Sequence, residues 1–100
     1  MKTFKIVLQN IVKQDVKSTC TWYDDQKKGL GKRFVDDMKQ TLIAIERNPT
    51  SFAIRHKSFR LANFSIFPYA AHFFIDEESH TIFIFAVLHT KRHPDTGSNR

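Results

Sequence analysis

The sequence has only one cysteine and no long apolar run. The shortage of cysteine and the lack of an apolar run each exclude a class of protein. Cys20 has no second cysteine with which to form an intramolecular disulfide or a metal cluster, as is typical of a reducing compartment. No segment approaches the roughly 20 apolar residues that a membrane-spanning helix needs. Residues 1–10 lack the apolar core and the small-residue cleavage site of a secretory signal peptide. We therefore expect a cytoplasmic protein with no membrane segment.

The composition that remains is that of one small basic domain. Hydrophobic residues make up 41% of the 100 residues, and ten phenylalanines supply the bulk of a core without disulfides. Lys and Arg outnumber Asp and Glu by 16 to 10, a net charge of +6, and residues 51–75 contain no acidic residue at all. Such a surface favours an anionic partner, either a nucleic acid or an acidic protein.

The first half of the chain has the pattern of two amphipathic helices, expected near residues 11–27 and 31–48. Gly29 and Gly31 interrupt the apolar periodicity between them and predict a tight connection. The second helix should end at Asn48, because the residue before Pro49 is disfavoured in the α region. Two such helices joined by a short connection predict an antiparallel helical hairpin. The buried stripe of the second helix is expected to contain Phe34, Met38, Thr41/Leu42 and Ile45.

The rest of the chain predicts strands near residues 58–64, 67–76 and 81–89, in addition to one near residues 3–8. The last strand is apolar on both faces, which is typical of a central strand or of a face that receives a partner. Its alternation would place Ile82, Ile84, Ala86 and Leu88 on one face, and Phe83, Phe85 and Val87 on the other. The predicted fold is α+β in two layers, a helical hairpin packed on an antiparallel sheet in the order β-α-α-β-β-β. Residues 1–94 should form this single domain, and residues 95–100 a flexible tail.

Three patches of the chain resemble the RelE/ParE family of toxins, and its ParE-type branch more closely. Their order and spacing hold from about residue 4 to residue 94. The patches are Trp22-Tyr23-Asp24-Asp25-Gln26 leading into Gly29-Leu30-Gly31-Lys32-Arg33-Phe34, then Asn48-Pro49, and then Phe67-Pro68-Tyr69 followed by Ala86-Val87-Leu88-His89 and Arg92-His93-Pro94.

The resemblance implies the RelE/ParE-like fold and the toxin half of a bacterial type II toxin–antitoxin system, as found in plasmid stabilisation. It implies growth inhibition, a cognate antitoxin as partner and no cofactor. RelE-type toxins cleave messenger RNA on the ribosome, whereas ParE-type toxins act on DNA gyrase, so gyrase or the ribosome with its mRNA would be the target. The shared fold does not choose between these targets.

Metal-independent RNA cleavage needs a base for the 2′-hydroxyl, an acid for the leaving oxygen and cations on the phosphate. RelE-type ribonucleases carry an arginine at the strand position of Arg60, and a second one where this chain has Ala70. The missing second arginine argues against a ribonuclease, in which Arg60 and His89 would be the catalytic residues. The groups available for such chemistry are Arg55, His56, Lys57, Arg60, Tyr69, His72, His89, Lys91, Arg92 and His93.

Structural roles compete with functional ones at several of these positions. His89 at a strand end could equally hydrogen-bond the exit loop, His72 fits a packed histidine, and Cys20 fits a core thiol. The five histidines lack the spacing of metal ligands, so no metal site is expected. Trp22 could belong to the core or to a surface facing the antitoxin.

The preferred interpretation is a ParE-like toxin that is not an enzyme and inhibits growth through a binding surface. One alternative is a RelE-like, ribosome-dependent mRNA endoribonuclease. Another is a non-toxic domain, either a basic nucleic-acid-binding module or a degenerate scaffold. The oligomeric state is left open. The binding surface is expected to comprise Arg55, Lys57, Arg60, Tyr69, His89, Lys91, Arg92 and His93.

Overall fold

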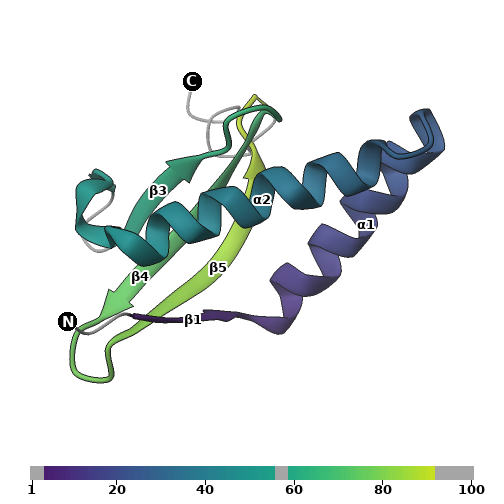
Figure 1. Ribbon diagram of the computed structural model, residues 1–100. Coiled ribbons are helices and arrows are strands. Elements are labelled where there is room, and N and C mark those ends of the chain that lie inside the picture. The colour runs from purple at the N-terminus through teal and green to yellow at the C-terminus, as the bar shows by residue number, and fades with distance from the viewer. Residues whose placement is uncertain (1–3, 56–58, 92–100) are drawn as a thin grey trace.

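A helical hairpin lies across one face of a five-stranded sheet in the computed structural model, which describes residues 4–55 and 59–91 (Figure 1). None of the helices in these residues is long and apolar enough to span a membrane. The elements in chain order are β1 (Lys5–Leu8), α1 (Asn10–Gln26), α2 (Leu30–Arg47), a 3₁₀ turn (Pro49–Ser51), β2 (Ile54–Arg55), β3 (Phe59–Asn63), β4 (Tyr69–Asp76) and β5 (Thr81–His89).

The strand order is β1-β5-β4-β3-β2, so the first and last strands of the chain are neighbours. Strands β3, β4 and β5 form the predicted antiparallel meander. Strand β1 pairs with β5 in parallel, with Ile6 opposite Ile82, because the chain crosses over through the helical hairpin before it re-enters the sheet. The predicted α+β fold class is confirmed, and the sheet is mixed rather than wholly antiparallel. The two-residue strand β2 is too short to leave a pattern in the sequence.

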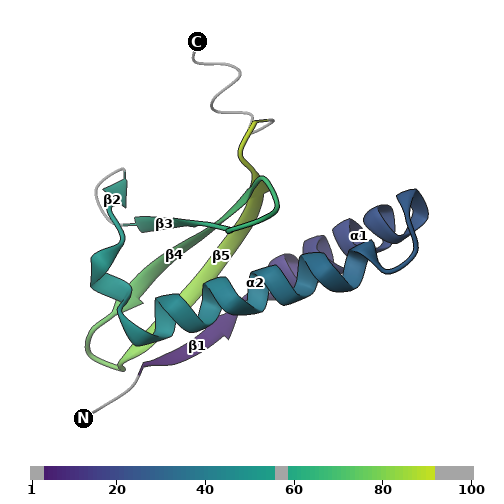
Figure 2. The same ribbon diagram turned by 45° about the horizontal axis from the view of Figure 1, so that its top comes forward.

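The connection between the helices depends on two glycines, as predicted. Gly29 has a φ of 90°, in the left-handed region that side chains disfavour. Gly31 lies against α1 so closely that a Cβ atom there would stand 2.5 Å from the Cys20 carbonyl oxygen. The Asp24 carboxylate accepts the Gly31 N–H at 2.8 Å and ties the helices together. The tip of this hairpin projects beyond the sheet (Figure 2).

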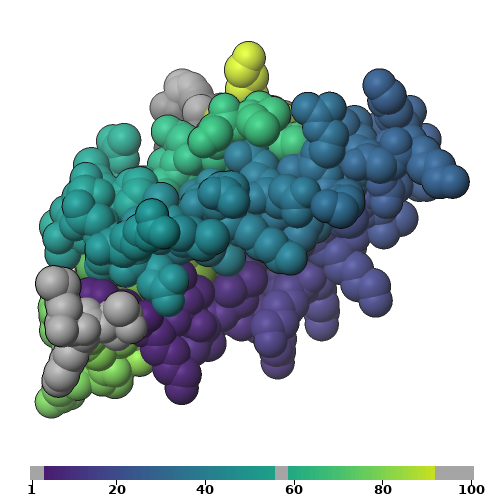
Figure 3. Space-filling model, viewed as in Figure 1, coloured from purple at the N-terminus to yellow at the C-terminus, as the bar shows by residue number. Residues whose placement is uncertain are grey.

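The core lies between α2 and the sheet. Every residue predicted for the α2 stripe is buried except Leu42, which is half-buried. Helix α2 crosses the front of the molecule in the space-filling view and covers this face of the sheet (Figure 3). The largest side chains that are fully buried are Phe34, Phe73, Ile45, Ile82, Ile84 and Val12.

A register shift between β4 and β5 corrects the predicted faces of the last strand. Phe73 lies opposite Ile84 and His72 lies opposite Ala86, so Phe85 is an extra residue in β5. Beyond this bulge Val87 joins Ile82 and Ile84 in the core, where simple alternation had placed Ala86. A single inserted residue exchanges the faces of all that follow it.

Candidate functional site

Three residues of the predicted binding surface meet where β4 begins and β5 ends. Tyr69 and His89 are register partners on these strands, and their rings meet edge to face with centroids 5.1 Å apart. The Lys91 backbone N–H donates to His89 Nδ1 at 3.0 Å. The end of the sheet thus holds an aromatic ring, an imidazole and an exposed lysine in one place.

A chain of hydrogen bonds from α2 fixes this end of the sheet. The buried Asp37 carboxylate accepts the backbone N–H groups of residues 65, 66 and 67, at 3.2, 2.9 and 2.8 Å. This anchors the loop that leads to Pro68. The Pro68 carbonyl then accepts the Thr90 backbone N–H at 2.8 Å and the Thr90 hydroxyl at 3.2 Å. The exit of β5, and with it His89, is therefore positioned from the helix.

A hollow of about 230 Å³ opens beside Tyr69, between the strand end and α1. It is lined by Ser18, Thr19, Trp22 and Tyr69, which provide two aliphatic hydroxyl groups, one phenol and one indole. Trp22 is 53% exposed, with its ring edge to face on Tyr23 at 5.1 Å. Trp22 is therefore a surface residue and not part of the core. An exposed indole beside a hollow is typical of a binding surface.

The hydrogen bond to Lys91 restricts what His89 can do. Because Nδ1 accepts a backbone N–H, the neutral ring carries its proton on Nε2. In this state Nε2 is a hydrogen-bond donor and has no lone pair with which to remove a proton. The arrangement suits recognition of an acceptor group better than activation of a 2′-hydroxyl.

Arg60 lies on β3, away from the His89 end of the sheet, and its guanidinium group already donates hydrogen bonds to backbone carbonyls. It is paired with Phe73 of β4, four residues from Tyr69, which places it roughly 13 Å from the His89 end along the strand direction. Arg60 Nη1 donates to the Phe52 carbonyl at 2.6 Å and to the Thr50 carbonyl at 3.4 Å. Arg60 therefore holds the segment between α2 and β2, and the fold does not bring it to His89.

The other predicted residues are distributed as follows. Arg55 is exposed on β2, at the edge of the sheet farthest from β1. His72 is buried within β4, as expected for a packed histidine. In the described residues no three His, Cys, Asp or Glu side chains gather as metal ligands would. The predictions for His56, Lys57, Arg92, His93 and the tail at residues 95–100 lie outside the described residues.

The chain matches no protein-family model and no curated protein. Its structure is similar to a chain of the chromosomal ParDE TA system from P. aeruginosa, with a TM-score of 0.73 at 12% identity, over 84% of this chain and 92% of that one. It is also similar to a chain of the archaeal RelE-RelB complex from Pyrococcus horikoshii OT3, with a TM-score of 0.55 at 13% identity, over 92% of this chain and 100% of that one. The chain has the RelE/ParE fold.

Within the RelE/ParE fold, the position at which the resemblance implies a second phosphate-binding arginine is Ala70. This alanine is 2% exposed and lies in β4 between Asn63 of β3 and Leu88 of β5. The site therefore offers no cation at Ala70, and the Arg60 guanidinium is bonded to backbone carbonyls.

Reasoning from the sequence missed Asp37, whose carboxylate orders the loop beside the site. The available signal was its position on α2, between Phe34 and Met38 on the apolar stripe. An acidic residue on a buried stripe needs hydrogen-bond donors, because an unpaired buried charge is costly. Its donors come from residues 28 to 30 positions later, which no local pattern reveals.

Proposed function

We propose that this protein is the toxin of a bacterial type II toxin–antitoxin system and is neutralised in the cytoplasm by a cognate antitoxin. Its structural neighbours support this, since one belongs to a ParDE TA system and the other to a RelE-RelB complex. The net charge of +6 supports an acidic antitoxin that folds on binding.

We further propose that the toxin is ParE-like and inhibits growth by binding its target, with DNA gyrase as the candidate. The observation that carries this proposal is the separation of Arg60 from His89. A ribonuclease needs cations and a proton-transfer group on one phosphodiester, and these two residues lie roughly 13 Å apart along the strands. Arg60 is also bonded to the Phe52 carbonyl.

The proposed toxic surface is the hollow at the end of the sheet, together with His89 and Lys91. Trp22 supplies an exposed aromatic anchor, and the largely buried Tyr69 also lines the hollow. Large aromatic side chains in such positions contribute most to protein–protein affinity. The exposed Lys91 adds a cation at the rim.

The test is expression of the chain and its variants with two parallel readouts, the mapping of transcript ends and gyrase supercoiling. Wild-type protein should inhibit supercoiling and leave transcript ends unchanged. Trp22→Ala should weaken inhibition by at least tenfold, in line with a hot-spot cost of about 2 kcal/mol. His89→Ala should keep measurable inhibition, because the imidazole contributes recognition rather than chemistry.

Ile54→Ala is the matched control, because Ile54 is an exposed apolar residue on the far edge strand β2. Ribosome-dependent cleavage that disappears in both His89→Ala and Arg60→Ala would replace this proposal with the RelE-like alternative. Absence of any growth defect, together with failure to bind the product of the adjacent short gene, would exclude a toxin.

A further inference from the structure

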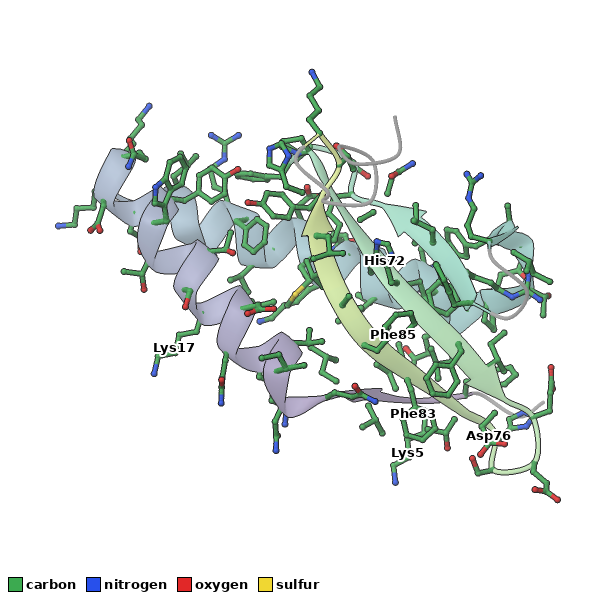
Figure 4. All side chains as sticks on the ribbon, turned by 180° about the vertical axis from the view of Figure 1, so that it is seen from behind. Lys5, Lys17, His72, Asp76, Phe83 and Phe85 are labelled. Carbon is green, nitrogen blue, oxygen red and sulfur yellow. The ribbon has the colours of Figure 1, made fainter. Side chains whose placement is uncertain are left out.

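The sheet has a second face, which α1 and α2 do not cover, and it is apolar. Figure 4 views the molecule from this side and shows Phe83 and Phe85 on the face of the sheet, with no described helix in front of them. Phe74 and Phe83 are stacked here, with centroids 5.2 Å apart. The apolar side chains that share the face are all half-buried, and they are Val7, Phe59, Phe74, Phe83 and Phe85. An apolar face of this kind on a charged chain is typical of an interaction site.

One row of residues across β5 carries charges of opposite sign. Asp76 of β4 is the only carboxylate within the described strands. Its register partner on β5 is Thr81, which pairs on its other side with Lys5 of β1. Both charged residues belong to the helix-free face, because their neighbours Ile6 and Ile75 pack on the core. Lys5 and Asp76 therefore flank β5 symmetrically, one strand away on each side.

The next row of this face is flanked in the same way by apolar side chains. Phe83 of β5 lies between Val7 of β1 and Phe74 of β4. A second copy of the chain, turned by 180° about an axis that runs along β5 in front of this face, would lay its β4 over β1. That rotation places each Lys5 opposite Asp76 of the partner subunit. It also places Phe83 on its own counterpart and Val7 on Phe74.

We propose that the helix-free face binds a second copy of this chain, in a two-fold dimer centred on β5. The charges identify the occupant. An acidic partner would set its carboxylates over Asp76, whereas a second copy sets a lysine there. Two sheets packed face to face keep their strands within about 30° of each other, so the strands beside β5 remain opposed.

The size of the contact predicts a transient dimer. Three strands face one another, β1, β5 and β4, and they cover an area roughly 14 Å wide and at most about 27 Å long. This is at the small end of specific interfaces, so we expect a dissociation constant above about 1 µM.

The proposed interface is separate from the proposed toxic surface. Thr81 and His89 are at opposite ends of β5, about 27 Å apart along the strand. The row of Lys5 and Asp76 lies at the Thr81 end, and the hollow beside Tyr69 lies at the His89 end. Self-association therefore goes beyond the proposed toxin function and does not depend on it.

The test is sedimentation of the full-length chain from about 5 to about 500 µM, the range in which a transient dimer forms. Lys5→Glu sets carboxylates against each other across the axis, and Asp76→Lys sets lysines against each other. Each variant should raise the dissociation constant at least tenfold. An equimolar mixture of the two variants restores both contacts of opposite charge, so the mixture should dimerise about as well as wild type. Mixing cannot rescue a variant that has failed to fold.

The apolar centre of the interface is tested by Phe83→Lys, which sets two like charges on the axis. This variant should remain monomeric over the whole concentration range. Ile66→Lys is the matched control, because it adds the same charge at a loop position that is 66% exposed. Its dissociation constant should equal that of wild type.

Three results would overturn the proposal. The first is a wild-type chain that stays monomeric at every concentration. The second is a mixture of Lys5→Glu and Asp76→Lys that dimerises no better than either variant alone. The third is a monomeric chain whose Phe83 ring signals in NMR shift on addition of oligothymidylate or polyglutamate, which would assign the face to a different partner.

Growth inhibition measured on the same variants keeps the two proposals apart. Lys5→Glu should inhibit growth as wild type does, because the hollow beside Trp22 lies at the other end of the sheet. A chain that dimerises but inhibits neither growth nor gyrase would overturn only the toxin proposal.

Discussion

At the scale of single residues, Asp37 contributes most to the order of the candidate site. Its two carboxylate oxygens accept three backbone N–H groups from the loop before β4, and its exposed fraction is 4%. Asn offers one oxygen in place of two and puts an NH₂ group against a backbone donor. Asp37→Asn should therefore lower the free energy of unfolding by about 1–3 kcal/mol, the cost of a buried group left unpaired.

Urea unfolding of the purified chain measures this cost. The control is Asp36→Asn, because Asp36 is an exposed neighbour whose ion pair with Lys32 should contribute less than about 1 kcal/mol. The amide NMR signal of Thr90 should also shift in Asp37→Asn, since that residue is bonded to the anchored loop through Pro68. Equal free energies of unfolding for the two variants would mean that the Asp37 carboxylate does not stabilise the loop before β4.

At the scale of elements, the helical hairpin depends on the close approach of α1 and α2 at Gly31. A Cβ atom there would lie 2.5 Å from the Cys20 carbonyl oxygen and 2.7 Å from its sulfur, so the backbones must separate. Gly31→Ala should lower the free energy of unfolding by about 1–3 kcal/mol, as other overpacked contacts do. Circular dichroism during thermal unfolding measures the loss.

Gly29→Asn is the comparison for this prediction. Gly29 has a φ of 90°, but a Cβ atom there would meet nothing within 4 Å, and asparagine tolerates left-handed backbone better than other side chains. Gly29→Asn should therefore lower the free energy of unfolding by less than Gly31→Ala does. The reverse order would mean that backbone conformation, rather than helix contact, limits the hairpin.

At the scale of the whole molecule, Phe34 joins both helices to the sheet. It is fully buried, and its ring contacts Tyr23 of α1, Tyr69 of β4 and the loop residues Phe64 and Phe67. Phe34→Ala should lower the free energy of unfolding by about 3–5 kcal/mol. This is a large part of the roughly 5–15 kcal/mol by which a domain is stable. The midpoint of chemical denaturation should fall accordingly.

Ile66→Ala is the control for Phe34, because Ile66 lies in the same region but is 66% exposed. It should change stability by less than about 0.5 kcal/mol. A loss below about 1 kcal/mol in Phe34→Ala would show that the helices and the sheet are not one cooperative core.

The sequence by itself determined the elements and most of their order. Period-3.6 stripes, two glycines and Pro49 defined the hairpin, and alternation defined the meander, because these signals depend on neighbours within a few residues. The resemblance of its short motifs to the RelE/ParE toxins also led to the fold that the structural comparisons support.

The tertiary structure decided what depends on distant partners. The bulge that turns Val87 into the core, the parallel pairing of β1 with β5 and the donors of Asp37 are all long-range features. Arg60 and His89 were predicted as one site from the family resemblance and the chemistry of RNA cleavage. The register of three strands sets them apart, and only pairing between strands fixes where a side chain lies along a sheet.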